Sequence, residues 1–220
     1  LLRHAVRSVA IDHGLRASFL AKPFADQVGS GMHLHINVVD EDGNNVFADE
    51  SELGSPRLGH AVAGMQATMA EAMAIFSPHV NAFRRYGLNM FTLLNRSWGA
   101  NNRSLTYRIP AGLPDARRIE HRIASADANP YLVLAAALAG AHHGLVNELD
   151  PGPTTSGNAG ERRDDSIPFT MPTALQRLGE AKVLPDYLSR EYLDMYRELK
   201  QGELDVFNER ISPLEYEWYL

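Results

Sequence analysis

Two histidines follow a glycine-rich turn in the run GSGMHLH at residues 29–35. Residues 32–39 alternate between apolar and polar types, which predicts a strand with one buried face. His33 and His35 then share the polar face, roughly 7 Å apart at the rise of a strand. Neutral imidazole binds divalent metals and can also contact phosphate. Two histidines on a solvated sheet face would show the same spacing.

A carboxylate stands between two arginines in the run RRIEHR at residues 117–122. In a strand, Arg118, Glu120 and Arg122 share one face. Glutamate offers hard oxygen to Mg²⁺ or Mn²⁺, and arginine offers a planar fork to carboxylate or phosphate. This arrangement suits a metal bound beside anionic substrate groups. The alternative is an exposed ladder of salt bridges.

Further arginines lie in the segment before this strand. Arg103 and Arg108 stand five residues apart in NNRSLTYRIP at residues 101–110, and Arg84 and Arg85 form a pair upstream. Arginine is usually a surface residue, but several arginines near few carboxylates are typical of sites that handle phosphates. Their occurrence with the histidine strand favours a polyanion-binding site.

The amino-acid composition and the net charge argue against several classes of function. The 220 residues are 45% hydrophobic, enough for one sizeable core. The chain has no cysteine, which excludes disulfides and thiolate zinc sites and favours a cytoplasmic protein. A net charge of −6 argues against nucleic acid as a partner. No apolar run reaches roughly 18 residues, so we expect no membrane span.

The pattern of elements predicts an α+β fold, in which helices back an antiparallel sheet with a polar active-site face. Gly14 should end a first helix at about His13. After the long helices we expect short ones, with breaks at Gly202 and at Ser212-Pro213. We expect strands at 17–21, 32–39, 46–48, 104–109 and 118–123, long helices at 56–76 and 131–145, and a surface loop at 150–165.

These motifs, in this order, resemble the glutamine synthetase family, and the resemblance covers essentially the whole chain. It implies an ATP-dependent ligation in which the γ-carboxylate of glutamate attacks the γ-phosphate of ATP, and an amine then displaces phosphate from γ-glutamyl phosphate. Mg²⁺ or Mn²⁺ would offset the phosphate charge. The matching segments are Lys22-Pro23, residues 29–35, Asn102-Arg103-Ser104, Arg108-Ile109-Pro110, residues 118–122 and residues 128–132.

The resemblance also implies roles for individual residues. His33 and Glu120 resemble metal ligands, and Arg103 resembles the arginine that acts in phosphoryl transfer. Gly29, Arg85 and Arg122 resemble the residues that bind glutamate. Arg85 is also expected to act in catalysis. The residues expected at the nucleotide are His35, Asn37, Arg108 and Arg118, with Asn37 carrying a changed side chain.

The chain begins inside an amphipathic helical pattern without an initiator methionine. We therefore expect residues 1–220 to be a partial catalytic domain that lacks the N-terminal domain and the first part of the catalytic domain. The family's other glutamate ligands for metal would lie in that missing part. Family members build their sites between neighbouring subunits, which implies a ring-shaped homo-oligomer. We expect the fragment to be inactive by itself.

Phe91 departs from the pattern of ammonia-using family members, and this departure predicts which amine accepts the glutamyl group. Ammonia-using members carry a glutamate at that place, and an aromatic side chain cannot hold ammonium by charge pairing. Residues 98–99, 120–122 and 215–220 also resemble the γ-glutamylpolyamine synthetase branch, which favours a polyamine or another primary amine. The alternatives are an ammonia-using glutamine synthetase and a non-catalytic scaffold or nitrogen sensor. Retention of His33, Glu120 and five candidate arginines argues against the non-catalytic alternative.

Overall fold

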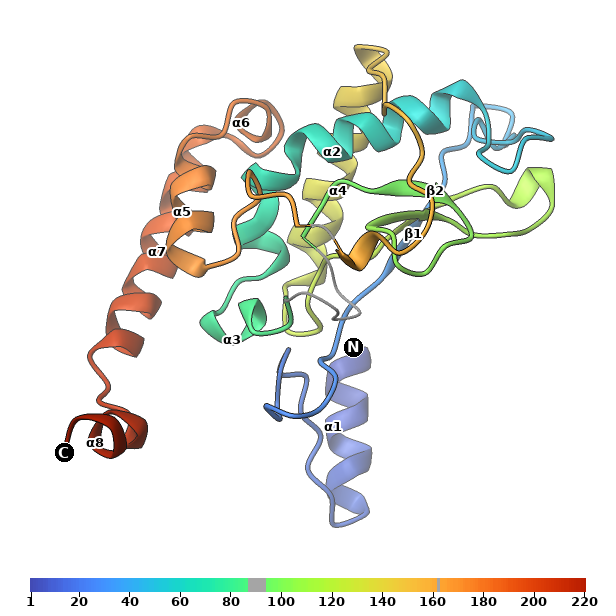
Figure 1. Ribbon diagram of the computed structural model, residues 1–220. Coiled ribbons are helices and arrows are strands. Elements are labelled where there is room, and N and C mark those ends of the chain that lie inside the picture. Colours follow the sequence, from blue (N-terminus) through green and yellow to red (C-terminus); the bar gives the residue numbers. More distant parts are fainter. Residues whose placement is uncertain (87–93, 162) are drawn as a thin grey trace.

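The computed structural model describes residues 1–86, 94–161 and 163–220. A four-stranded sheet lies beside a pair of long helices, which confirms the α+β class (Figure 1). A second group of helices packs against this pair, and α1 leads away from the body without a buried residue. The α-helices of the described residues are α1 (Leu2–Asp12), α2 (Pro56–Phe76), α3 (Val80–Phe83), α4 (Pro130–Val146), α5 (Met171–Gly179), α6 (Leu184–Leu188), α7 (Arg190–Asn208) and α8 (Pro213–Tyr219).

The sheet consists of β1 (Leu34–Ile36), β2 (Trp98–Ala100), β3 (Tyr107–Ile109) and β4 (Ile119–His121), in the order β1-β4-β3-β2. β4 pairs antiparallel with β1 and with β3, whereas β2 runs parallel to β3. The sheet is therefore mixed rather than wholly antiparallel. The sequence does not predict β2, because three residues with a central glycine show no alternation.

The core consists of buried residues from the sheet and from α2, α4, α5, α6 and α7. Met65, Met69 and Met73 follow one another at helical spacing on α2 and are almost completely buried. The fully buried Tyr107 of β3 donates its hydroxyl to the carbonyl oxygen of Met65 at 2.8 Å, which ties the sheet to the helix. Proline at the first position starts both α2 and α4, since its fixed φ suits a first helical turn.

Three glycines allow α2 and α4 to pack closely. A Cβ atom on Gly64 would lie 2.0 Å from the carbonyl oxygen of Gly140, and one on Gly144 would lie 1.9 Å from the carbonyl oxygen of His60. No side chain fits at these positions unless the helices separate. The helix pair therefore acts as a rigid support behind the sheet.

Two predicted strands do not form. At residues 17–21 the carbonyl oxygen of Ala21 accepts from the amide of Ser30, and no strand among the described residues pairs with the segment. At residues 46–48 pairing ends after the single bridge between Val39 and Asn45, because the Asn45 side chain accepts from the amide of Phe47 and turns the chain.

The strand predicted at 104–109 forms only in its last three residues. In the same way, the strand at 32–39 is reduced to β1 and the strand at 118–123 to β4.

The C-terminal segment departs from the prediction at one point. α7 continues through Gly202, because a buried face that includes Leu193, Tyr196 and Leu204 supports the helix on both sides of the glycine. The break predicted at Ser212-Pro213 is confirmed, and α8 begins there with a capping box between Ser212 and Glu215. No helix within the described parts of the chain is both long and apolar enough to cross a bilayer.

Candidate active site

His35 in β1 and His33 just before it lie on the same polar face, as the alternation predicts. Ile36 points into the core, whereas the side chains of His33 and His35 are 41% and 45% exposed. Asn37 is exposed beyond the end of the strand, and its side chain makes no hydrogen bond with any described residue. The structure therefore brings the two histidines into one cluster and leaves Asn37 at its edge.

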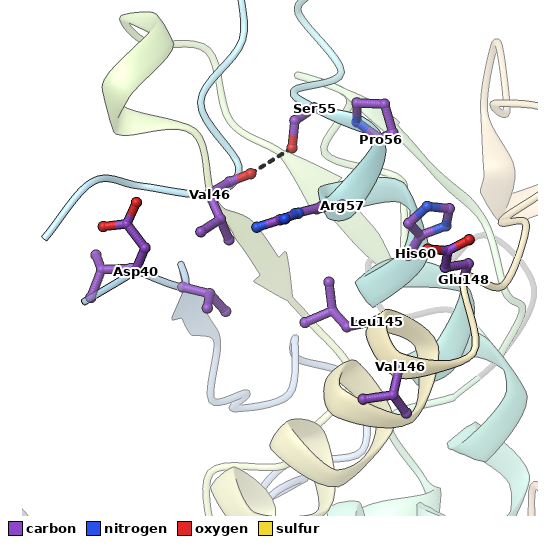
Figure 2. Close-up of a pocket in the computed structure, with 11 residues that line it drawn as sticks. Asp40, Val46, Ser55, Pro56, Arg57, His60, Leu145, Val146 and Glu148 are labelled. Carbon is purple, nitrogen blue, oxygen red and sulfur yellow. Dashed lines mark hydrogen bonds between the residues drawn. The ribbon is translucent and has the colours of Figure 1, made fainter. Parts of the chain in front are cut away.

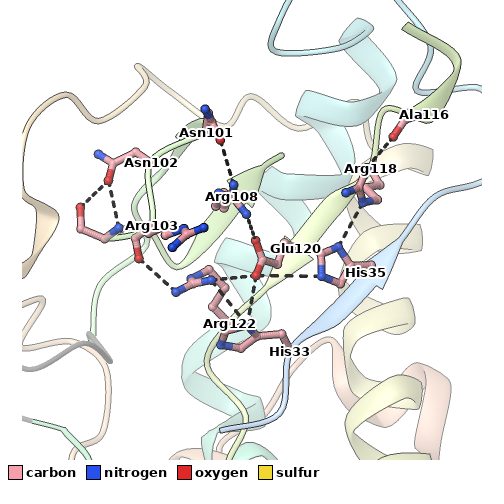
Figure 3. A network of polar contacts seen from close by, with 11 residues as sticks. His33, His35, Asn101, Asn102, Arg103, Arg108, Ala116, Arg118, Glu120 and Arg122 are labelled. Atoms are coloured by element: carbon pink, nitrogen blue, oxygen red, sulfur yellow. Dashed lines mark hydrogen bonds and ion pairs between the residues drawn. The ribbon is translucent and has the colours of Figure 1, made fainter. Parts of the chain in front are cut away.

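Glu120 of β4 is the centre of this cluster (Figure 3). Its carboxylate is only 5% exposed and contacts Arg108 of β3 at 2.6 Å, Arg122 at 2.7 Å and His33 at 3.0 Å. The antiparallel register explains the contact with Arg108, which is paired with Glu120, and it places His35 on the other side with Nε2 4.0 Å from the carboxylate. The two strands that flank β4 thus deliver an imidazole and a guanidinium to one carboxylate.

The arginines keep Glu120 ionised. Burial by itself raises the pKa of this carboxyl, but the hydrogen bond from Arg108 and the charges of Arg122 and Arg108 outweigh burial and lower its pKa. Burial and the positive charge of Arg122 lower the pKa of His33. A carboxylate and a neutral imidazole are the protonation states that metal binding requires.

His33 and Glu120 would supply only part of a metal site. His33 and Glu120 are suitable donors for Mg²⁺ or Mn²⁺, but no group of three or more His, Cys, Asp or Glu side chains in the described parts of the chain is arranged to hold an ion. Glu120 also shares its carboxylate with two guanidiniums. These two residues fit a metal as partial ligands and leave most of its coordination to other donors.

The remaining arginines of the cluster are held in different ways. Arg118 donates from Nε to Nδ1 of His35 at 3.1 Å, which orients that ring. Arg122 donates from Nη2 to the carbonyl oxygen of Arg103 at 3.1 Å. The exposed guanidinium of Arg103 itself makes no hydrogen bond with a described residue. Arg103 is therefore the arginine of this set that is most available to a ligand.

Arg85 lies next to this cluster, beneath the glycine-rich turn. It is 3% exposed, and its Nη1 donates to the carbonyl oxygen of Ile123 at 3.4 Å. A Cβ atom on Gly29 would lie 2.7 Å from Cγ of Arg85, and one on Gly31 would lie 2.7 Å from its Nη2. These glycines make room for the Arg85 side chain, a task that the sequence does not reveal. The charge of Arg85 also contributes to lowering the pKa of His33.

A loop after β2 supports the arginines, and sequence reasoning missed part of it. The Asn101 side chain accepts from Nη2 of Arg108 at 2.8 Å. Asn102 donates to the carbonyl oxygen of Gly157 at 2.7 Å, and Ser104 accepts from the amide of Ala159 at 3.0 Å. The loop is thereby fixed to residues 157–159. The doubled asparagine before Arg103 was the available signal, since asparagine tolerates tight turns.

The sequence of the chain matches a known protein family. Residues 1–219 match the catalytic domain of glutamine synthetase. The chain belongs to the glutamine synthetase family. Among curated relatives it is 40% identical to gamma-glutamylputrescine synthetase PuuA of Escherichia coli (strain K12), covering 100% of this chain and 46% of that protein.

Two further curated relatives and one solved structure match the chain at lower identity. Identity is 34% to glutamine synthetase of Thermus thermophilus, covering 98% of this chain and 50% of that protein. It is 31% to glutamate–isopropylamine ligase of a Pseudomonas species, covering 100% and 49%. The ligand-free structure of GmaS superposes with a TM-score of 0.86 at 31% identity, covering 98% of this chain and 51% of GmaS. The chain spans about half the length of the relatives it matches.

A separate pocket lies on another part of this glutamine synthetase-type domain (Figure 2). It has a volume of about 800 Å³ and lies between the segment after β1, the start of α2 and the end of α4. Val38, Val46 and Leu145 form apolar walls, and Arg57 and Glu148 contribute charge. None of the site residues predicted from the sequence lines this pocket.

Proposed function

We propose that the protein to which this chain belongs joins the γ-carboxylate of glutamate to an amine at the expense of ATP, by way of γ-glutamyl phosphate. The observation that carries the proposal is the buried carboxylate of Glu120, shared by Arg108, Arg122 and His33. A carboxylate ringed by arginines is suited to a metal and to phosphate oxygens at the same place. Membership of the glutamine synthetase family supplies the reaction class.

In this proposal His33 and Glu120 hold a divalent ion, Mg²⁺ or Mn²⁺, together with ligands from elsewhere in the protein. When bound, the ion neutralises phosphate charge. Glu120 stays ionised at neutral pH because Arg108 and Arg122 hold its pKa down. His35, Asn37, Arg108 and Arg118 bind the nucleotide, with His35 oriented by Arg118.

The proposed glutamate site uses Gly29, Arg85 and Arg122. Arg85 is rigid because it is buried against the glycine turn, so it can fix a carboxylate in one orientation. Arg103 meets the transferring phosphoryl group, since its exposed guanidinium makes no hydrogen bond with the described residues.

The proposed chemistry proceeds in two displacements. A γ-carboxylate oxygen forms a bond to the γ-phosphorus of ATP, and the bond from that phosphorus to the ADP oxygen breaks. The amine nitrogen then forms a bond to the acyl carbon, and inorganic phosphate leaves with the electrons of the broken C–O bond. The amine loses a proton in this step. Arg103 and Arg85 offset the negative charge that accumulates on the transferring group.

We further propose a polyamine or another primary amine as acceptor and a ring of identical subunits as the assembly. Two of the relatives have names that describe glutamate–amine ligation, with putrescine and with isopropylamine. Phe91 supports the same choice from the sequence, because an apolar side chain stands where a glutamate would bind ammonium. Phe91 lies outside the described residues, so this argument rests on its identity alone.

The test is phosphate release by the full-length protein with ATP, Mg²⁺, glutamate and an amine panel of ammonium, putrescine, spermidine, spermine and ethanolamine. We expect turnover with a diamine or polyamine and almost none with ammonium. Efficient use of ammonium would make the protein an ordinary glutamine synthetase. The absence of phosphate release with every amine would refute the proposed ligation.

A further inference from the structure

We propose that Asn101 is a positioning residue for Arg108, and that it controls nucleotide binding through that arginine. This inference rests on the proposed function, in which Arg108 binds the nucleotide. The side-chain oxygen of Asn101 accepts from Nη2 of Arg108 at 2.8 Å, while Nη1 of the same guanidinium contacts Glu120 at 2.6 Å (Figure 3). Asn101 is exposed and belongs to none of the motifs that carry the family resemblance.

The backbone of Asn101 is fixed in an unusual conformation. Its φ is +47°, in the left-handed region, and its amide donates to the carbonyl oxygen of Ile109 at 2.8 Å. Glycine, asparagine and aspartate adopt this region at little cost. Of these three, only asparagine and aspartate carry an oxygen that can accept from Arg108. The position therefore combines a backbone requirement with a side-chain requirement.

Arg108 depends on this contact for its orientation. Its Nε is buried and has no hydrogen-bond partner among the described residues, so Glu120 and Asn101 are the two groups that hold the guanidinium there. Glu120 is also drawn towards Arg122 at 2.7 Å. Without Asn101, Arg108 would be fixed at one nitrogen only and could rotate about that contact.

The same loop secures the second arginine on Glu120. Nη2 of Arg122 donates to the carbonyl oxygen of Arg103, two residues after Asn101. Each guanidinium thus contacts Glu120 through one nitrogen and the loop through another. The difference between them is that Arg122 uses a backbone oxygen, which no substitution removes, whereas Arg108 uses a side chain. Nucleotide binding is therefore sensitive to the residue type at position 101.

Two variants of the full-length protein separate the side chain from the backbone. Asn101→Gly keeps the left-handed conformation and removes the acceptor, whereas Asn101→Asp keeps both. Glu148→Gly is a matched control, since Glu148 also has φ of +47° but lines the separate pocket. Binding of ADP with Mg²⁺ is measured by titration calorimetry, and KM for ATP, KM for glutamate and kcat are measured by phosphate release.

We expect Asn101→Gly to weaken ADP binding and to raise the KM for ATP by roughly tenfold, since a hydrogen bond to a charged group is lost. The KM for glutamate should change much less, and Asn101→Asp should restore binding. Glu148→Gly should match the wild type. Unchanged ADP binding in Asn101→Gly, or equal losses in Asn101→Gly and Asn101→Asp, would overturn the inference.

The calorimetry also keeps this inference distinct from the proposed ligation. A wild type that binds ADP but ligates no amine would refute the ligation, and the ADP affinities of the variants would still decide the role of Asn101. A wild type that binds no ADP would overturn both.

Discussion

Arg108 and Glu120 are register partners on neighbouring antiparallel strands, and their side chains meet at 2.6 Å on the polar face of the sheet. Pairing on one face of a sheet brings opposite side chains into direct contact. The strand register, rather than a loop, therefore sets this distance. The same register brings His35 opposite Glu120 on the other side.

Removal of the Arg103 side chain should affect the chemical step. Arg103→Ala in the full-length protein should lower kcat by roughly 10²- to 10³-fold, because a preorganised charge at the transferring group is lost. ADP affinity should stay unchanged, and the fold should persist, since the guanidinium makes no hydrogen bond with the described residues. Single-turnover phosphate release checks this. Arg57→Ala, in the separate pocket, is the control, and an equally slow Arg57→Ala would argue against a specific role for Arg103.

A methyl group at Gly31 should displace Arg85. In Gly31→Ala the new Cβ would lie 2.7 Å from Nη2 of Arg85, so the guanidinium must move. We expect the KM for glutamate to rise roughly ten- to hundredfold, because small misplacements of a positioning group are costly. Gly112→Ala is the control, as its Cβ would meet nothing closer than 3.7 Å. If Gly31→Ala leaves the KM for glutamate unchanged, Arg85 does not belong to the proposed glutamate site.

The contact between α2 and α4 should be intolerant of any side chain. Gly64→Ala should destabilise the protein by about 2–4 kcal/mol, because its Cβ would overlap the backbone of α4. Gly202→Ala in α7 should instead stabilise it by about 0.5–1 kcal/mol, since that position is open and helical. Urea unfolding measures both changes. Similar effects of the two substitutions would contradict the close helix contact.

His121 should make stability depend on pH. Burial lowers its pKa to about 4 from the usual 6.5, so the unfolded chain binds more protons than the folded protein between these values. Stability should therefore fall as the pH drops from 6.5 towards 4, by about 2 kcal/mol at pH 5 from this residue alone. Urea unfolding at pH 7 and pH 5 measures the loss.

His121→Leu should abolish this part of the pH dependence. The ring packs against Phe76 and Tyr107, and neither ring nitrogen has a hydrogen-bond partner among the described residues. An apolar side chain of similar size therefore suits the site at pH 7. A variant whose stability falls as steeply as that of the wild type between pH 7 and pH 5 would show that other groups cause the loss.

The sequence predicts those parts of the site that depend on local periodicity. Alternation in residues 32–39 is enough to place His33 and His35 on the face opposite Ile36. The long helices 56–76 and 130–146 follow from proline at the first position and a serine or asparagine before it. These features involve neighbours along the chain, which is why a single sequence reveals them.

Features that depend on tertiary contacts are not readable in this way. The contact of Glu120 with His33 depends on the register of β1 against β4. The packing of Arg85 against Gly31 joins segments that are far apart in the sequence. Gly202 stays helical because buried neighbours outweigh its low helix propensity. In the first two cases the deciding partner is distant along the chain, and in the third the packing of α7 against α5 and α6 decides.

The hydrogen bonds of Asn102 to Gly157 and of Ala159 to Ser104 have a practical consequence for protein engineering. Composition alone would mark residues 150–165 as a spacer in which length is free, and hence as a convenient place for a tag or a fused domain. These bonds instead make the segment a support for the loop that carries Asn101 and Arg103. Asp42-Gly43 lies in a turn where a Cβ on the glycine would meet nothing within 4 Å, so an insertion there would leave these hydrogen bonds intact.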